Sequence, residues 1–290
     1  MTDLSFGLNV PPAVTPGTDP VAFARRAEDL GFDFVSANDH MHGPDPRYEA
    51  WTLLSWIAAG TSRIRVATRV LGVPYRNPAV VAKMAESFER LSEGRLILGL
   101  GAGASDEEFR AFGLAPAAPR DKVDGLEEAI RIIRGLWSEQ TFTFEGTHHR
   151  THRAEVQPKP DRPIPIWLGT YGPRALGVTG RLADGWIPSV DLAPPERVPA
   201  MWERIARAAR EAGRDPADIT AVYNLEVRVD ERAEPHPFVV SGSPAEVADQ
   251  LHGFARLGFT AFNFIPFGSD SDGQAERLAG EVIPAVRAGA

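Results

Sequence analysis

Short apolar segments alternate with amphipathic segments of helical spacing along the whole chain, and this order constrains the fold more than any other feature. The apolar segments are predicted to be strands over Leu4–Val10, Phe32–Ala37, Arg63–Val70, Arg95–Leu100, Ile164–Gly169, Gly185–Ser189, Ile219–Val229 and Ala261–Pro266. The amphipathic segments are predicted to be helices over Asp19–Leu30, Tyr48–Ala59, Asn77–Leu91, Lys122–Trp137, Pro173–Leu182, Pro194–Ala212, Pro244–Leu257 and Asp272–Arg287. Eight strand–helix units predict an α/β fold with a parallel sheet, closed as a (β/α)8 TIM barrel.

The length of the chain suits one such barrel. It has 290 residues, and barrels of this kind run to about 250 residues or more as one domain. No linker interrupts the alternation, so residues 1–290 are expected to form a single domain. Only Gln140–Glu155 departs from the pattern, because Phe142 and Phe144 alternate with polar residues. This segment is predicted to be a small inserted β-hairpin.

Composition excludes several classes of protein. A net charge of −8 argues against broad binding to nucleic acid or to anionic membranes. The absence of cysteine excludes disulfides, iron–sulfur clusters and thiolate metal sites. No segment is long and apolar enough to span a membrane, and Met1–Asn9 lacks the features of a secretory signal, so the cytoplasm is the expected location. The excess of arginine over lysine is typical of a GC-rich genome, such as that of an actinobacterium.

The residues after each predicted strand are the candidates for chemistry, because barrel active sites lie at the C-terminal ends of the strands. Asp39 and His40 follow the second strand. A carboxylate beside an imidazole orients a general acid or base, or contacts a cofactor. A simple turn that caps the strand would have the same pattern, so both interpretations stay open.

A glycine-rich loop, Gly99–Ala104, follows the fourth strand, and Ser105 or Asp106 is placed to cap a helix after it. Glycines allow backbone N–H groups to approach a phosphate or a flat ring. The loop also fits the dinucleotide-binding pattern G-x-G-x-x-G/A, but no acid follows at the required distance, which favours a barrel loop. A tight turn that needs only small residues is the structural alternative.

The loop after the fifth strand, Gly169–Ala175, enters a helix at Pro173. Free N–H groups at a helix start, with Thr170 and Arg174 close by, favour a phosphate site. An ordinary βα turn with a solvated arginine is the structural alternative. His148 and His149 lie in the predicted hairpin, where they would face opposite sides. Because no nearby carboxylate is expected to complete a ligand set, no metal site is predicted there.

In this order and spacing the segments resemble the luciferase-like monooxygenase family, and within it the coenzyme F420-dependent oxidoreductases. The motifs that carry the resemblance span nearly the whole chain: Phe6-Gly7-Leu8, Ala37-Asn38-Asp39-His40, Tyr75–Val80, Gly94–Gly103, Gly169–Arg174 and Arg181–Trp186. The resemblance implies a luciferase-like barrel that holds F420, a deazaflavin, at its mouth. It also implies hydride transfer between F420 and a small organic substrate with a C=C, C=N or C=O bond, and a homodimer.

The resemblance also implies roles for individual residues. His40, steered by Asp39, would deliver the proton, and Arg69-Val70 would form a bulge with a non-proline cis peptide bond behind the ring. The cofactor contacts would be Asp39, Arg69, Val70, Gly72, Ala102, Gly103, Glu107, Gly169, Thr170, Tyr171, Gly172, Arg174 and Ala175.

This sequence departs from the family pattern at two positions. Ala104 stands where the sugar-phosphate dehydrogenases of the family have a glutamate that takes part in proton transfer, so that reaction is not expected here. Glu107 or Glu108, one turn onward, could supply the missing carboxylate. Gly72 stands where those relatives have a threonine that contacts the cofactor.

Two other functions remain compatible with the sequence. One is an FMN-dependent luciferase-like monooxygenase, in which a peroxyflavin would oxygenate the substrate. The other is a protein that binds a flavin or deazaflavin without catalysis. Aromatic residues are expected to line the substrate pocket in each case: Tyr75, Trp186, Phe264 and Phe267.

Overall fold

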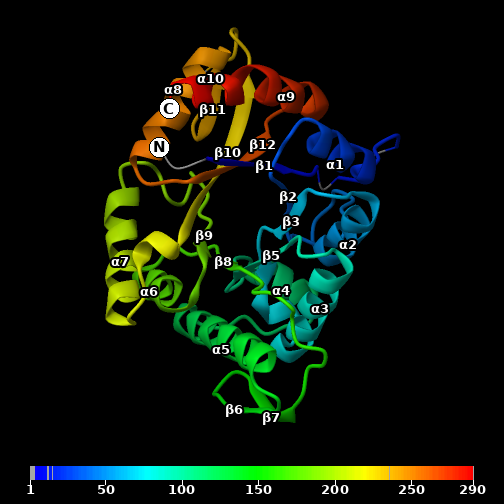
Figure 1. The fold of residues 1–290 in the computed structure, drawn as a ribbon, viewed down its shortest axis with the longest axis vertical. Helices are drawn as coiled ribbons and strands as arrows, with labels where there is room; N and C mark the ends of the chain where they lie inside the picture. Colours follow the sequence, from blue (N-terminus) through cyan, green and yellow to red (C-terminus); the bar gives the residue numbers. More distant parts are fainter. Residues whose placement is uncertain (1–3, 12, 15, 235, 290) are drawn as a thin grey trace.

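The computed structural model describes residues 4–11, 13–14, 16–234 and 236–289, which form a closed barrel of parallel strands surrounded by helices (Figure 1). The barrel strands are β1 (Ser5–Asn9), β2 (Phe34–Ala37), β3 (Arg65–Thr68), β5 (Leu96–Gly101), β8 (Ile166–Leu168), β9 (Gly185–Trp186), β10 (Thr220–Val229) and β12 (Ala261–Pro266). Each strand pairs in parallel with the next, and β10 pairs with both β9 and β12, which closes the ring. The predicted (β/α)8 barrel is confirmed.

The helices of the barrel lie where the sequence predicts them. They are α1 (Pro20–Asp29), α2 (Ala50–Gly60), α3 (Pro78–Leu91), α5 (Pro119–Ser138), α6 (Pro173–Leu182), α7 (Val198–Glu211) and α8 (Pro244–Arg256). Side-chain oxygens of Asp19, Asn77 and Ser243 accept backbone N–H groups at the starts of α1, α3 and α8. These caps, with proline in the first turn, explain why the helices begin at these positions.

Several elements differ from the predictions. The expected C-terminal helix is divided into α9 (Ser271–Arg277), a π-helical stretch and α10 (Ile283–Ala288). A short helix, α4 (Asp106–Ala111), follows the glycine-rich loop, and Ser105 caps it. Two strands were not predicted, the two-residue β4 (Leu71–Gly72) and β11 (Val239–Gly242). The predicted hairpin is confirmed as β6 (Phe142–Glu145) and β7 (Arg150–Ala154), which lie beside α5 at the bottom of Figure 1.

Aromatic side chains fill the inside of the barrel. Phe34 and Trp167 meet edge to face with their ring centroids 5.5 Å apart, among the buried residues Ala67, Ile97, Val222 and Ala261. A side chain at Gly7 would overlap the ring of Phe34, and one at Gly185 would overlap Trp167. These glycines are therefore needed because two large rings occupy the barrel interior.

Two of the aromatic residues that were expected to line the substrate pocket lie in the core instead. Trp186 and Phe264 are fully buried in the large hydrophobic core cluster that also contains residues of the surrounding helices. The prediction was wrong for these two because residues of a barrel strand point alternately inward and outward. The position of a residue near a strand end does not show which side it faces.

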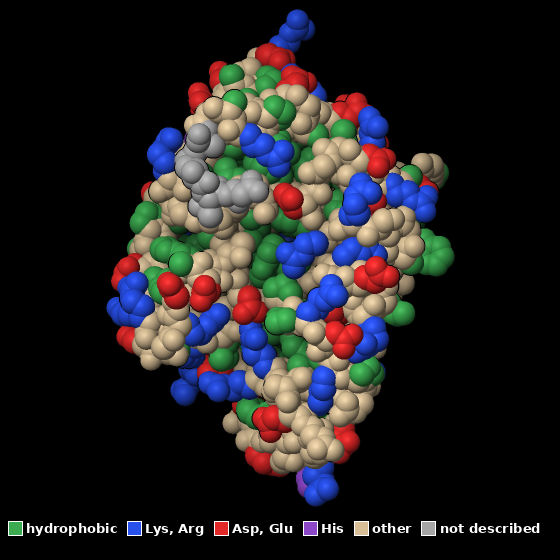
Figure 2. Space-filling view, in the orientation of Figure 1, with side chains coloured by type: hydrophobic (Ala, Val, Ile, Leu, Met, Phe, Trp, Pro, Cys, Tyr) green, Lys and Arg blue, Asp and Glu red, His purple; other side chains and the backbone are tan. Residues whose placement is uncertain are grey.

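Charged side chains of both signs are interspersed over the face of the molecule in Figure 2, and apolar side chains are visible in the hollow at its centre. In the part of the chain that the structure describes, no helix has the length and apolar character needed to cross a bilayer.

Candidate active site

A cavity of about 430 Å³ opens at the C-terminal ends of the barrel strands. Its size falls within the usual range of small-molecule sites. The structure brings together twelve of the fourteen predicted site residues in its walls: Asp39, His40, Arg69, Val70, Gly72, Ala102, Gly103, Gly169, Thr170, Tyr171, Gly172 and Ala175. Glu107 and Arg174 do not line it.

Asp39 is buried, and its carboxylate is held by the loop after β4. Arg76 binds it with both terminal nitrogens, at 2.6 and 2.8 Å, and the backbone N–H of Gly72 donates to it at 2.9 Å. The same arginine also donates to Glu49, the cap of α2. Burial lowers the pKa of Arg76, but the bonds to Asp39 and Glu49 outweigh this and raise the pKa overall. Asp39 therefore fixes the cavity wall.

His40 is oriented by Glu108 rather than by Asp39. Its Nδ1 lies 2.9 Å from Oε1 of Glu108, while the hydroxyl of Tyr75 donates to Oε2 of the same carboxylate at 2.8 Å. The predicted steering by Asp39 is wrong because successive residues of an extended segment point to opposite sides. Burial, and after it the bond to Glu108, raises the pKa of Tyr75, so Tyr75 stays a neutral donor.

The structure distinguishes Glu107 from Glu108. The side chain of Glu108 is 10% exposed, whereas Glu107 is exposed to solvent and lies outside the cavity. Successive helical residues project about 100° apart, so α4 turns only one of the two toward His40. Phe109, next to Glu108, is fully buried. This apolar residue is the signal in the sequence that could have shown which face of α4 points inward.

The bulge after β3 carries the peptide bond between Arg69 and Val70, which is cis, as the family resemblance implied. Val70 packs against two glycines, Gly101 at the end of β5 and Gly169 directly after β8. A Cβ at Gly101 would lie 2.6 Å from Val70, and one at Gly169 would lie 3.2 Å from it. These two glycines therefore make room for the bulge, and for Gly101 this agrees with the alternative of a tight turn that needs only small residues.

Other parts of the two glycine-containing loops leave backbone donors open to the cavity. The N–H groups of Ala102, Gly103, Tyr171 and Gly172 donate to no residue that the structure describes. Gly103 adopts a φ of +88°, and a side chain there would overlap the ring of Phe109. A larger residue would thus both strain the loop and displace α4. Four unused donors around one cavity suit a ligand with several acceptor atoms.

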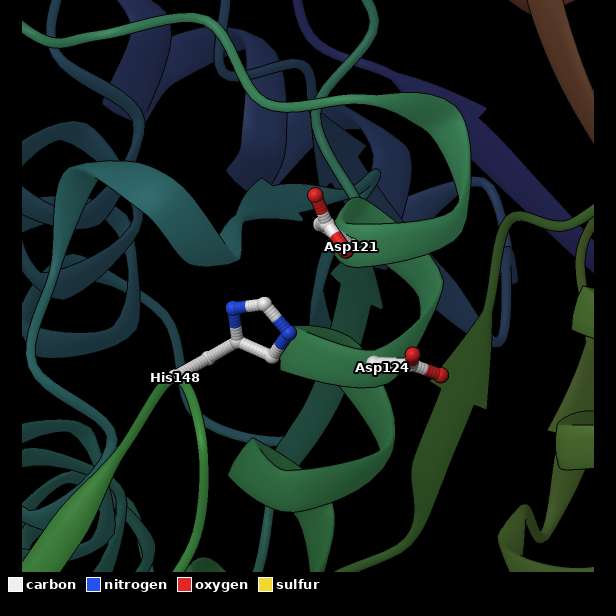
Figure 3. Close-up of side chains that lie close together, drawn as sticks. All are labelled: Asp121, Asp124 and His148. Carbon is white, nitrogen blue, oxygen red and sulfur yellow. The ribbon is translucent and has the colours of Figure 1, made fainter.

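Arg174, predicted to bind phosphate, points away from the cavity. Its guanidinium pairs with Asp124 of α5, and its side chain is 50% exposed. Asp121, Asp124 and His148 have possible ligand atoms within 4.8 Å of one another, with His148 reaching from the hairpin toward α5 (Figure 3). The expectation of no carboxylate near the histidines was therefore wrong, because α5 packs against the hairpin. A cation there would compete with Arg174 for Asp124, and we assign no metal.

A buried polar network, which the sequence did not predict, crosses the barrel below the cavity. The Nε of Arg69 donates to Asn9 at 3.0 Å, and Asn263 bonds to both Ser36 and Asn224 at 2.9 Å. Burial lowers the pKa of Arg69 to about 10. The four residues around the arginine come from β1, β2, β10 and β12, so only the closed barrel brings them together.

Comparison with known proteins places this barrel and its cavity in a family. The model of the family described as luciferase-like monooxygenase matches residues 6–236, which contain all of the predicted site residues. The chain belongs to the luciferase-like monooxygenase family. It is an enzyme of that family.

Luciferase-like relatives with an assigned activity cover most of the chain. The F420-dependent glucose-6-phosphate dehydrogenase of Kineococcus radiotolerans is 31% identical over 91% of this chain and 92% of the relative. The phthiodiolone/phenolphthiodiolone dimycocerosates ketoreductase of Mycobacterium tuberculosis is 38% identical, over 61% of this chain and 46% of the relative.

Solved structures share the luciferase-like fold at lower identity. An F420-dependent secondary alcohol dehydrogenase in complex with an F420-acetone adduct has a TM-score of 0.88 at 22% identity, covering 98% of this chain and 99% of that one. A monooxygenase from Streptomyces bottropensis has a TM-score of 0.81 at 22% identity, covering 97% and 99%. At such identities the structures establish the fold, which serves both reaction types.

Gly72 lies close to the side chain of Tyr75 in this luciferase-like site. A Cβ at Gly72 would lie 2.7 Å from the ring of Tyr75, so a threonine does not fit while Tyr75 keeps its place beside Glu108. In the same way, Ala104 provides no carboxylate, and Glu108 supplies one from α4. The two departures from the family pattern are thus both linked to the cluster of His40, Glu108 and Tyr75.

Proposed function

We propose that this protein is an F420-dependent oxidoreductase that transfers hydride between the deazaflavin and a small organic substrate with a C=O, C=C or C=N bond. The observation that carries the proposal is the bond between His40 and Glu108 at the wall of the cavity. A histidine held by a carboxylate is suited to proton transfer. A relative that is similar over 91% of the chain is named as F420-dependent, which favours this cofactor.

The residues of the cavity fit a flat cofactor with polar edges. The free N–H groups of Ala102, Gly103, Tyr171 and Gly172 would hold its acceptor atoms, and Val70 would support the ring. When bound, F420 supplies or accepts the hydride. The protein then has to hold the substrate, exclude water and move one proton.

His40 is the group that moves the proton in this proposal. Glu108 bonds to Nδ1, which leaves Nε2 for the substrate. In the reducing direction, hydride adds to the carbon of a C=O bond while Nε2 gives a proton to the oxygen. Glu108, which also accepts the hydroxyl of Tyr75, stabilises the protonated histidine before the transfer.

Binding of the two candidate cofactors tests the proposal directly. We expect the purified protein to bind F420 at least about tenfold more tightly than FMN, as measured by fluorescence titration, and to oxidise F420H2 in the presence of a carbonyl substrate without oxygen. Selective binding of FMN, with substrate turnover only in oxygen, would instead support the luciferase-like monooxygenase. Binding of F420 without oxidation of F420H2 by a carbonyl, alkene or imine substrate would overturn the proposed reaction.

Arg174 remains our proposed contact to the cofactor phosphate, although it pairs with Asp124 in this structure. We expect Arg174→Ala to weaken F420 binding about tenfold, the usual size of one charge-assisted hydrogen bond. Arg120→Ala is the matched control, because Arg120 also lies beside Asp124, at 3.7 Å, but precedes the cavity loop. Equal affinity of both variants for F420 would place the phosphate elsewhere.

A homodimer is the proposed assembly, and one surface suits it. An apolar groove of about 820 Å³ lies along α2 and α3, away from the strand ends, and Trp56, Val80 and Leu91 on these helices are 71%, 55% and 86% exposed. Exposed apolar surface of this kind is typical of interfaces. We expect the double variant Val80→Glu/Leu91→Glu to be monomeric in light scattering, while Phe238→Glu, at an exposed site outside this groove, stays dimeric. A wild-type monomer would contradict this assembly.

A further inference from the structure

Arg69 is a cation in the cavity wall that the protein leaves without an ionic partner. Its Nε donates to Asn9, and its backbone N–H donates to the carbonyl of Ala37 at 2.8 Å. Among the described residues, no carboxylate lies within 4.0 Å of its guanidinium, and its two terminal nitrogens make no hydrogen bond. The cavity lining contains no second arginine and no lysine from the described parts of the chain.

The position of this guanidinium is fixed by the buried network beneath it. The amide oxygen of Asn9 accepts from Arg69 at 3.0 Å and from the hydroxyl of Ser36 at 3.4 Å. Ser36 in turn donates to Asn263, which donates to Asn224, both at 2.9 Å. The hydroxyl and the three amides are at most 4% exposed. A cation held in this way is preorganised for a ligand, which lowers the entropy lost on binding.

The electrostatics of the cavity favour a singly charged anion at Arg69. Burial lowers the pKa of Arg69, and Tyr171, Glu226 and Asp191 offset this only in part, so the group is charged at neutral pH but poorly compensated. Asp39 and Glu108 are already bound by Arg76 and His40, and Asp191 is exposed at the rim. A dianion would add a second negative charge among these carboxylates, whereas a monoanion would balance Arg69 alone.

We propose that Arg69 binds a carboxylate of the substrate, so that the enzyme acts on small organic acids whose reducible bond lies beside His40. A planar carboxylate can accept from both free terminal nitrogens of the arginine. The two groups approach the cavity from different walls, because Arg69 extends toward Asn9 at the end of β1 while His40 bonds to α4. The inference rests on the proposed function for the reaction, but the recognition of a carboxylate can be measured without it.

The first experiment uses the protein without cofactor. Benzoate and benzamide have the same shape and differ in charge, and calorimetry of each against wild type gives their affinities directly. We expect benzoate to bind at least about tenfold more tightly than benzamide, Arg69→Met to remove this difference, and Arg69→Lys to keep part of it. Equal binding of the two probes to wild type, or a preference that survives in Arg69→Met, would overturn the proposal. Tighter Arg69-dependent binding of phenyl phosphate would also overturn it.

The second experiment uses the F420H2-loaded enzyme with a 2-oxo acid and its methyl ester. We expect the ratio of kcat/KM for acid over ester to be at least about tenfold in wild type and to fall to about one in Arg69→Met. If Arg69→Met weakens F420 binding and leaves this ratio unchanged, the arginine belongs to the cofactor site and the proposal fails. If wild type binds no F420 at all, the proposed function fails, and the benzoate measurement still decides the role of Arg69.

Discussion

Replacing His40 by alanine is expected to lower kcat by roughly 10²- to 10⁴-fold, the usual contribution of a positioned general acid or base. Affinity for F420 should stay within a factor of about two, because the open backbone donors of the cavity belong to other loops. Glu108→Gln should reproduce most of the loss, since the amide keeps the shape of the side chain but loses the charge that stabilises a protonated His40. Steady-state kinetics at saturating F420H2 measure both effects.

His42→Ala is the matched control for this pair of variants. His42 lies two residues further along the same loop, and its ring contacts Phe112, at 6.2 Å between centroids, rather than Glu108. We expect its kcat to stay within about twofold of wild type. Unchanged turnover in His40→Ala would remove this histidine from proton transfer. A normal rate in Glu108→Gln together with a slow His40→Ala would show that the carboxylate only positions the ring.

The second large effect concerns stability rather than turnover. We expect Asp39→Ala to lower the free energy of unfolding by about 3–5 kcal/mol, the usual cost of removing one partner from a buried ion pair. The loss leaves Arg76 with Glu49 alone and the backbone N–H of Gly72 without its acceptor. Urea denaturation followed by circular dichroism measures the change.

Asp191→Ala serves as the comparison for Asp39→Ala. Both acids line the same cavity, but Asp191 is exposed and makes no ion pair with a described residue. A surface substitution of this kind usually changes stability by no more than about 0.5 kcal/mol. If the two variants were equally stable, the contact of Asp39 with Arg76 would not hold the cavity wall together, and the family's cofactor contact would be the better explanation of this residue.

The fold was predictable because its signals are local. Alternating apolar and amphipathic segments fix where strands and helices occur, and the right-handed βα unit leaves few ways to arrange them. The side of the barrel to which a residue points was harder to predict, as Trp186 and Phe264 show. Both side chains lie in the core rather than at the cavity. Residues along a strand face alternately inward and outward, and the sequence of a short strand does not show which of them face inward.

The chemistry of the site depends on contacts between residues that are far apart in the sequence, and no local sequence pattern predicts such contacts. His40 and Glu108 are 68 residues apart, and Asp39 and Arg76 are 37 residues apart. The loops could be located from glycines and strand ends, but the choice of partner depends on how α4 and the loop after β4 pack over the barrel. For this reason the neighbour in sequence, Asp39, was a poor guide to the partner of His40.

The filled interior of the barrel limits where ligands can enter and leave. Phe34 and Trp167 occupy the space inside the strands, while the cavity lies at the strand ends, so ligands are expected to enter and leave at the strand ends. A substrate bound above the ring of the proposed cofactor at this entrance would block the exit of the cofactor. If F420 binds as proposed, with the substrate above it, the closed barrel predicts that the cofactor binds before the substrate and leaves after it.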